Sequence, residues 1–199
     1  MKKLNFDRLP HLFYHSTRIV YTHMSTFFAR ISARWWGVQI GRGCKFVGRP
    51  HYKRYPGSSI VIGQNCQFNS SPASNWIGVN RPCMISALKE GAKLSIGERC
   101  GFSGTVIACA RQITIGKNVR CGANTLINDT DWHADDPRTS QDAPVEICDN
   151  VWLGANVTVL KGVTIGEGSL IGMGSLVNRS IPARVVAAGV PAKVIRSLE

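Results

Sequence analysis

A polar, turn-rich segment at residues 128–144 carries the side chains best suited to acid–base chemistry. It contains Asn128, Asp131 and His133, and His133 is the only histidine after His51. Histidine has an unperturbed pKa of about 6.5, so a neutral imidazole can accept a proton from a hydroxyl and return it to a leaving group. We therefore predict that His133 is a general base whose tautomer is fixed by Asp131 or Asn128. Orientation by a backbone carbonyl, or a merely solvated histidine, stays open at this point.

A six-residue repeat surrounds this segment. The repeating unit reads apolar-Gly-x-x-small-x, a period that fits neither an α-helix nor an alternating strand. It suits a triangular coil in which each short strand buries one apolar and one smaller residue, and such repeats are typical of a parallel β-helix. The apolar positions at strict spacing are Ile147, Leu153, Val159, Ile165, Ile171 and Val177, and earlier units begin at Ile40, Ile62, Ile96 and Ile115.

The repeat divides the chain into three predicted parts. Residues 1–37 form a basic helical segment, residues 38–179 form the coil, and residues 180–199, with two prolines, close it. Ile127 and Ile147 are twenty residues apart, two more than three repeats, so residues 128–144 form a loop that interrupts the coil. Loops on a rigid scaffold often carry catalytic residues, which supports the assignment to His133.

The amino-terminal segment is predicted to be one amphipathic helix. Its apolar face could cap the coil, pack on a neighbouring subunit, or lie on a membrane with Trp35 and Trp36 at the boundary, and we favour capping or packing. Residues 1–54 contain eleven Lys or Arg and the single acid Asp7, so they hold +10 of the net charge of +12. A basic end on a near-neutral body indicates a local contact with phosphates or anionic lipid rather than a nucleic-acid surface, and a merely solvated basic subunit surface stays open as the alternative.

Composition limits the remaining possibilities. The 199 residues are 44% hydrophobic, enough for one sizeable core. No run approaches the roughly 18 apolar residues of a membrane span, and no signal-like start is present, which predicts a cytoplasmic protein that could sit at the inner face of the membrane. The seven cysteines form no CxxC pair and mostly occupy repeat positions, so we expect reduced, packed thiols rather than a catalytic thiol or a metal site.

The run from Ile147 to Val177, followed by residues 187–195, resembles the hexapeptide-repeat sugar O-acetyltransferases, which include the maltose, galactoside and nodulation-factor enzymes. The similarity is strong over residues 113–196 and only repeat-level over residues 38–112. Because residues 1–37 lack the usual amino-terminal segment of the maltose and galactoside enzymes, the acetyltransferases of exopolysaccharide, capsule or lipopolysaccharide sugars are more similar. The resemblance implies a left-handed coil, a homotrimer with sites between neighbouring chains, acetyl-coenzyme A as co-substrate without a metal, and His133 as the base.

Site residues follow from the same resemblance. Lys193 and Arg196 are expected to meet the phosphates of the coenzyme, as basic groups suit anionic oxygens. Ser103 stands where the family places an asparagine that contacts the acceptor, and Trp132 is expected to contact the acceptor beside His133. The expected acetyl-coenzyme A contacts are Trp152, Ala155, Met173, Asn178, Arg179, Lys193 and Arg196.

The sequence therefore predicts an all-β, left-handed parallel β-helix with an amino-terminal helix, acting as an acetyl-coenzyme A-dependent O-acetyltransferase in bacterial surface polysaccharide biosynthesis. The acceptor would be a sugar, a nucleotide sugar or a lipid-linked sugar, and no nucleic acid is expected. Acetylation of an amino sugar, a serine hydroxyl or an antibiotic, and a non-catalytic scaffold, stay open as alternatives, because a fold does not choose among them. A γ-class carbonic anhydrase would need three histidines on zinc, and only one lies in the repeat region.

Overall fold

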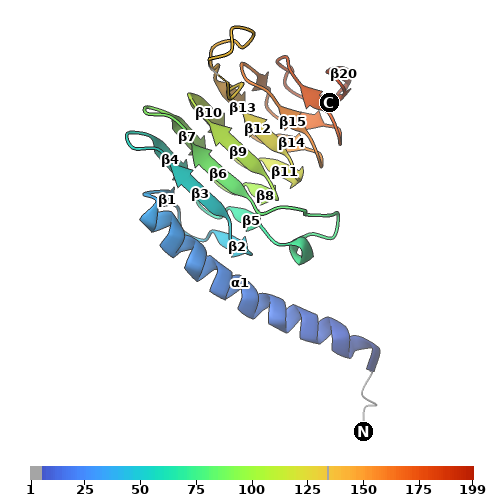
Figure 1. Ribbon diagram of the computed structural model, residues 1–199. Helices are drawn as coiled ribbons and strands as arrows, with labels where there is room; N and C mark the ends of the chain where they lie inside the picture. Colours follow the sequence, from blue (N-terminus) through green and yellow to red (C-terminus); the bar gives the residue numbers. More distant parts are fainter. Residues whose placement is uncertain (1–5, 134) are drawn as a thin grey trace.

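The computed structural model describes residues 6–133 and 135–199 and shows a coil of short strands above one long helix (Figure 1). A short 3-10 turn, Phe6–Arg8, leads into helix α1, Leu9–Trp35. The strands then fall into three sheets that form the faces of the coil.

Sheet 1 contains β1 (Gln39–Ile40), β4 (Ser59–Ile62), β7 (Lys93–Ile96), β10 (Gln112–Ile115), β13 (Val145–Ile147) and β16 (Thr164–Ile165). Sheet 2 contains β2 (Lys45–Val47), β5 (Gln67–Asn69), β8 (Gly101–Ser103), β11 (Arg120–Ala123), β14 (Trp152–Leu153), β17 (Leu170–Ile171), β19 (Val185–Gly189) and β20 (Ala192–Ser197). Sheet 3 contains β3 (His51–Arg54), β6 (Met84–Ala87), β9 (Val106–Cys109), β12 (Leu126–Asn128), β15 (Thr158–Val159) and β18 (Leu176–Val177).

Successive turns stack in register along each face. In sheet 1, Ile62 pairs with Ile96, Ile96 with Ile115, and Ile115 with Ile147, all in parallel. These are the apolar positions of the six-residue unit, so the repeat places one apolar side chain per turn in the same inward column. The prediction of a left-handed parallel β-helix with one amino-terminal helix is confirmed. We call the corner between sheets 2 and 3 the 2–3 edge, and the corner between sheets 3 and 1 the 3–1 edge.

The interior of the coil is filled by stacked side chains. The Phe68 ring lies 4.9 Å from the ring of Phe102 and is nearly parallel to it, and both are fully buried. The small inward position is a thiol in several turns, and the Cys66 thiol donates to the Gly97 carbonyl of the next turn at 3.2 Å. A Cβ on Gly63 would lie 2.6 Å from the Gly97 backbone, which explains the glycine after the apolar residue. Six of the seven cysteines are buried, as expected for packed thiols.

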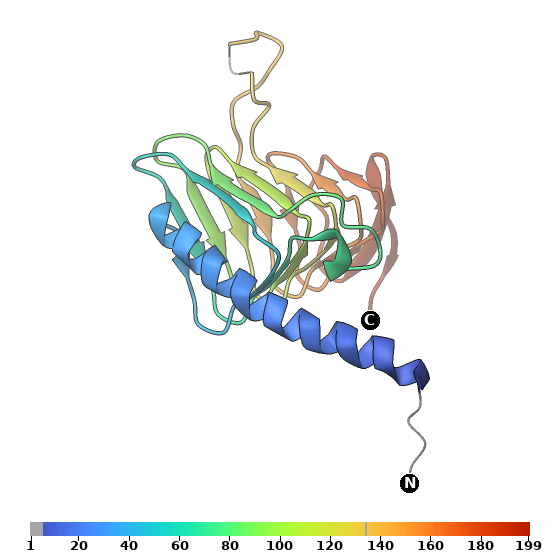
Figure 2. The same cartoon turned by 60° about the horizontal axis from the view of Figure 1, so that its bottom comes forward.

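Helix α1 covers the first turn of the coil with its small and polar side chains. Ala29 and Ala33 are buried there. The Thr26 hydroxyl accepts the Phe46 N–H at 3.0 Å, and Arg30 donates to a backbone carbonyl of the first turn at 2.9 Å. The face that we expected to cap the coil, the apolar one, is instead exposed. Figure 2 shows α1 crossing beneath the coil and continuing past it.

The carboxyl terminus closes the other end. Strands β19 and β20 pair antiparallel, and β19 joins β17 in sheet 2. No helix in the described part of the chain is long and apolar enough to cross a membrane.

Candidate active site

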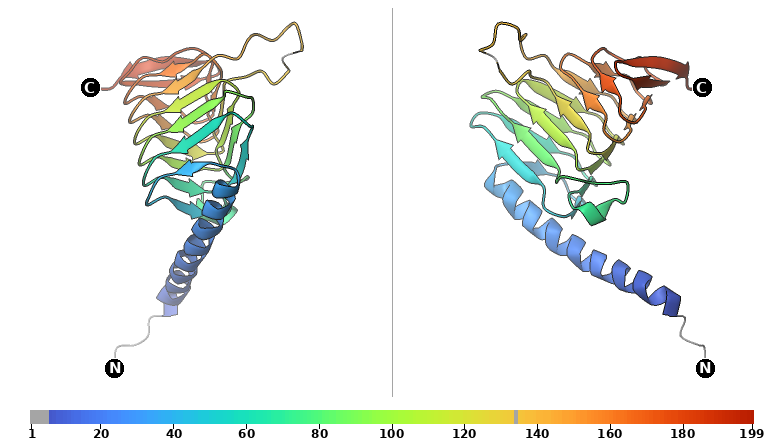
Figure 3. Two further views of the ribbon diagram at one scale, coloured as in Figure 1. Left: turned by 90° about the vertical axis from the view of Figure 1, so that its left-hand side faces the viewer. Right: turned by 45° about the vertical axis from the view of Figure 1, so that its right-hand side comes forward.

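The loop at residues 128–144 leaves the 3–1 edge between β12 and β13 and projects away from the coil (Figure 3). Its backbone forms turns around His133, whose N–H donates to the Asp131 carbonyl at 2.9 Å. The His133 carbonyl accepts the Asp136 N–H at 3.0 Å and the Thr139 hydroxyl at 3.0 Å. The imidazole is exposed and makes no hydrogen bond to any residue that the structure describes. It can therefore exchange a proton with a bound molecule.

The Asp131 side chain contacts the loop backbone and the coil, and not the His133 imidazole. Its Oδ2 forms an ion pair with the Lys161 ammonium and accepts the Ser140 N–H at 3.2 Å. The hydrogen bond from Lys161 lowers the pKa of Asp131 below its ordinary value. Lys161 lies on the next turn at the same 3–1 edge, between β15 and β16. The contacts of Asp131 thus fasten the loop to the coil below it.

The base of the loop is held by two buried side chains. Asn128 Nδ2 donates to the Thr130 carbonyl at 2.9 Å, and Asn128 Oδ1 is buried without a partner among the described residues. Asp129, which the sequence analysis did not select, is fully buried and accepts the backbone N–H groups of Ala110, of Arg111 at 2.8 Å and of Gln112 at 2.7 Å. An acid two residues after the apolar repeat position Ile127, where the period breaks, was the available sequence signal for this anchor.

Ser103 lies at the 2–3 edge, at the end of β8, and is 5% exposed. Its Oγ accepts the Nδ2 groups of Asn69 at 3.1 Å and of Asn75 at 3.2 Å. Asn75 belongs to an insertion between β5 and β6 whose Trp76 is 80% exposed. Ser103 therefore organises two asparagine amides next to an exposed aromatic side chain, an arrangement that sequence reasoning missed. Trp132, by contrast, is an exposed residue of the His133 loop.

Three of the expected coenzyme contacts line the same side as Ser103. Trp152 is half-exposed at the start of β14 in sheet 2. Ala155 follows it at the 2–3 edge and packs with Val79 of the insertion. Met173 is exposed at this edge one turn further on, where the Gly174 N–H donates to the Ala155 carbonyl at 2.8 Å.

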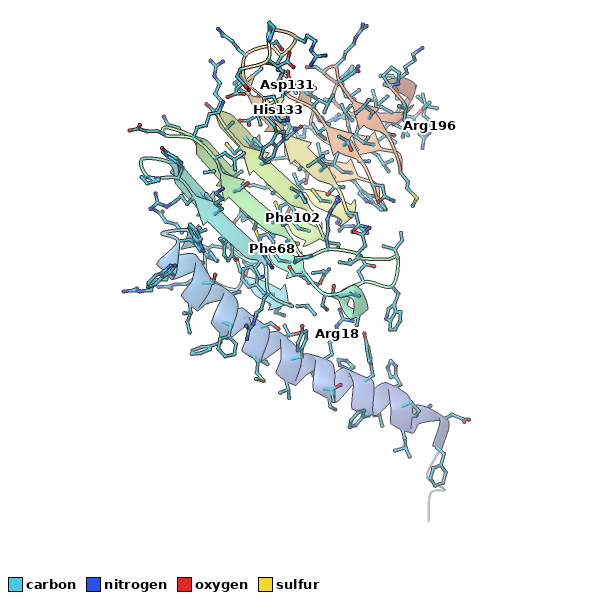
Figure 4. The ribbon with its side chains drawn as sticks, in the orientation of Figure 1. Arg18, Phe68, Phe102, Asp131, His133 and Arg196 are labelled. Atoms are coloured by element: carbon cyan, nitrogen blue, oxygen red, sulfur yellow. The ribbon has the colours of Figure 1, made fainter. Side chains whose placement is uncertain are left out.

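The other expected coenzyme contacts lie elsewhere. Asn178 and Arg179 are exposed at the 3–1 edge after β18, the edge that carries the His133 loop. Lys193 and Arg196 are exposed on β20, and neither forms an ion pair with a described residue. Figure 4 places His133 and Arg196 on separate elements, and Figure 3 shows the loop and the carboxyl terminus on opposite sides of the coil. A single chain does not bring His133 together with Ser103, Met173 and Arg196.

The cavities of the structure lie away from the residues described above. Two cavities of about 590 and 460 Å³ lie between α1 and the first turns, away from the His133 loop. Within residues 6–133 and 135–199, no group of three His, Cys, Asp or Glu side chains is arranged to hold a metal ion.

Comparisons with known proteins identify the family. The family described as "Bacterial transferase hexapeptide (six repeats)" matches residues 144–179. The "Putative lipopolysaccharide biosynthesis O-acetyl transferase WbbJ" of Escherichia coli K12 is 40% identical over 169 residues, which cover 78% of this chain and 80% of that protein. A "Putative acetyltransferase" of Schizosaccharomyces pombe is 42% identical over 113 residues, which make up 55% of this chain. The match spans about half, 52%, of that relative's length.

Among solved structures, the fold is similar to that of AntD, an N-acyltransferase from Bacillus cereus in complex with dTDP and 3-hydroxybutyryl-CoA. The TM-score is 0.64 at 17% sequence identity, covering 85% of this chain and 88% of that one. The chain belongs to the hexapeptide-repeat acetyltransferase family. The predicted family and enzyme class, an acyltransferase, are confirmed.

Proposed function

We propose that the protein transfers an acetyl group from acetyl-coenzyme A to a sugar hydroxyl in the biosynthesis of a bacterial surface polysaccharide, with His133 as the general base. The observation that carries the proposal is the exposed His133 imidazole, which bonds to no described residue, on a loop anchored to a rigid coil by Asp129 and Lys161. The name of the similar Escherichia coli protein supports a sugar acceptor and transfer to oxygen.

The chemistry needs one proton carrier. A neutral His133 imidazole accepts the proton of the acceptor hydroxyl while the hydroxyl oxygen forms a bond to the acetyl carbon. The bond from that carbon to sulfur breaks, and the imidazolium returns the proton to the departing sulfur. A thioester is reactive enough that no covalent bond to the enzyme is required, and a positioned base contributes about 10²–10⁴-fold to the rate.

The 2–3 edge suits a long, flexible thioester. Ala155 is small and Met173 exposes a thioether, so an extended pantetheine arm can follow the backbone at this edge without meeting a large side chain. Lys193 and Arg196 are exposed and form no ion pair with a residue that the structure describes, which suits them to phosphate oxygens at the end of that arm. When bound, acetyl-coenzyme A supplies the activated acetyl group.

A complete site requires more than one chain. His133 and the residues of the 2–3 edge lie on different corners of one coil, and cyclic assembly places one corner of each chain against another corner of its neighbour. We infer a homotrimer in which the His133 loop of one chain faces the Ser103 and Met173 edge of the next. Asn75 and Trp76 would then lie near the acceptor, and Trp132 would contact it beside the base.

The test is acetyl transfer from labelled acetyl-coenzyme A to a panel of free sugars, nucleotide sugars and lipid-linked sugars. His133→Ala should lower kcat by about 10²–10⁴-fold, the contribution of a general base. Asp135→Ala, an exposed change on the same loop, serves as the matched control and should retain activity. Near-normal turnover by His133→Ala would refute the assignment. Paired acceptors that carry a hydroxyl or an amino group at one position separate transfer to oxygen from transfer to nitrogen.

A further inference from the structure

Helix α1 exposes a continuous row of large apolar side chains, here called the outer face. The members recur three, four or seven residues apart, the spacing of one side of a helix. Their exposed fractions range from 51% for Ile31 to 88% for Trp35. The outer face consists of Phe13, Val20, Met24, Phe27, Ile31 and Trp35.

The coil cannot cover this face, because the opposite side of α1 is already bound to it. Ser25, Ala29 and Ala33 are buried against the first turn. Toward the amino terminus, Arg18 donates to the Ser74 carbonyl at 3.3 Å and Tyr14 donates to the Ala73 carbonyl at 3.1 Å. Figures 2 and 4 show the helix lying along the end of the coil. These contacts fix α1 with its apolar row exposed, and at the carboxyl end of the row Ile31 and Trp35 also line the open cavity of about 590 Å³ beside the first turns.

Positive charge borders the outer face. Arg34 lies one turn from Ile31 on the helix surface and is exposed. On the other side, the Arg49 guanidinium lies 4.7 Å from the Phe28 ring centroid. Over residues 6–54 the chain has nine Lys or Arg and one acid, Asp7, which gives a net charge of 9 − 1 = +8. The apolar row thus lies within a strongly basic surface.

This charge decides between two possible occupants. A second copy of the chain docked face to face would bring two surfaces of the same positive sign together, and like charges at an interface are unfavourable. The surface of an anionic bilayer offers the opposite charge, and each nearby Lys or Arg strengthens such binding. Trp and Phe side chains suit the boundary between headgroups and acyl chains.

We propose that the outer face of α1 docks in the plane of an anionic phospholipid bilayer, with its apolar side chains among the acyl chains and Arg34 and Arg49 at the headgroups. The helix lies on the membrane and does not cross it. Docking at this end leaves the His133 loop, which projects from later turns of the coil, outside the bilayer (Figure 3). The proposal stands independently of the proposed transferase activity.

The experiment measures co-sedimentation of the full chain with vesicles of phosphatidylcholine alone or with about 30% phosphatidylglycerol. Binding should require phosphatidylglycerol and weaken at high salt, since screening shortens electrostatic attraction. Phe13→Ser/Phe27→Ser/Ile31→Ser and Arg34→Glu/Arg49→Glu should each lower vesicle affinity at least about tenfold. Val61→Ser and Lys93→Glu, exposed changes on sheet 1, are the matched controls and should bind as the unaltered chain does.

Thermal unfolding of each variant establishes that the coil is intact, which is expected because every altered side chain is exposed. Equal binding to both vesicle types, or unchanged binding by both multiple variants, would overturn the proposal. A change in oligomer mass in the Phe13/Phe27/Ile31 variant with unchanged vesicle binding would also overturn it, in favour of a second copy on the outer face.

Discussion

The ion pair between Asp131 and Lys161 joins the loop that carries His133 to the next turn of the coil. Lys161 also donates to the Ser140 carbonyl at 2.7 Å, so one ammonium group contacts both sides of the loop. Its side chain is 15% exposed, although it lies at an edge of the coil. The position of the base is therefore set by a side chain outside the loop.

Removing this contact should loosen the loop without unfolding the coil. Lys161→Met and Asp131→Asn should both speed trypsin cleavage after Arg138, whose side chain is 88% exposed, because the loop opens more often. The melting temperature should change little, since the pair joins a projecting loop to the coil and Asp131 is 40% exposed, and ion pairs open to solvent contribute little to stability. Lys93→Met is the matched control. Unchanged cleavage in both loop variants would show that other contacts hold the loop.

The same ion pair gives a pH dependence. Lys161 lowers the pKa of Asp131, so the contact is fully formed above the unfolded-state pKa of an aspartate and is lost as the pH falls through the lower folded value. Hydrogen exchange in residues 128–144 should therefore be constant near neutral pH and become less protected under acidic conditions, after correction for the intrinsic rate. Asp131→Asn should remove this acid-dependent change. A variant that kept the full change would assign it to another group.

Asp129 is expected to matter more for stability than any exposed loop residue. Asp129→Ala removes an acceptor shared by three backbone N–H groups, and a hydrogen bond to a charged group contributes about 1.5–3 kcal/mol. Urea unfolding at one protein concentration should show a loss of at least that size. Asp129→Asn keeps one acceptor oxygen and should lose less, while the exposed control Asp135→Ala should stay within about 0.5 kcal/mol of the unaltered chain. Equal stability of all three would contradict the anchoring role.

The sequence predicts the coil well because the repeat is local: each inward residue and each glycine is set by its place in six residues, as Ile62 and Gly63 illustrate. The His133 loop is equally visible as a break in that period. Long-range partners are not visible. Neither Lys161, thirty residues from Asp131, nor Asn75, twenty-eight from Ser103, has a local pattern that selects it. The side of α1 that faces the coil was not predicted, because small side chains rather than large apolar ones form this contact.

Thiol reactivity should single out Cys148. It is the one cysteine in the described ranges that is not fully buried, and burial followed by the nearby carboxylates of Glu146 and Asp149 raises its pKa. Alkylation of the native protein should modify this residue first, slowly at neutral pH and faster as the pH rises toward the raised pKa, because the thiolate is the reactive form. Mass spectrometry of Cys148→Ala should show that this modification is gone. Rapid labelling of another cysteine would mean that the coil opens.

Active-site complementation tests whether the site lies between chains. His133→Ala removes the base at the 3–1 edge, and Trp152→Ala/Met173→Glu disrupts the coenzyme edge, so each variant alone should be inactive. If every site takes His133 from one chain and the 2–3 edge from its neighbour, random one-to-one mixing in a trimer leaves about a quarter of the sites intact. Refolding the two variants together should therefore recover about a quarter of full activity. A site built within one chain would recover none, since every chain in the mixture carries one defect. Differently tagged chains, captured in sequence, show that mixed oligomers have formed, and their inactivity would reject the shared site.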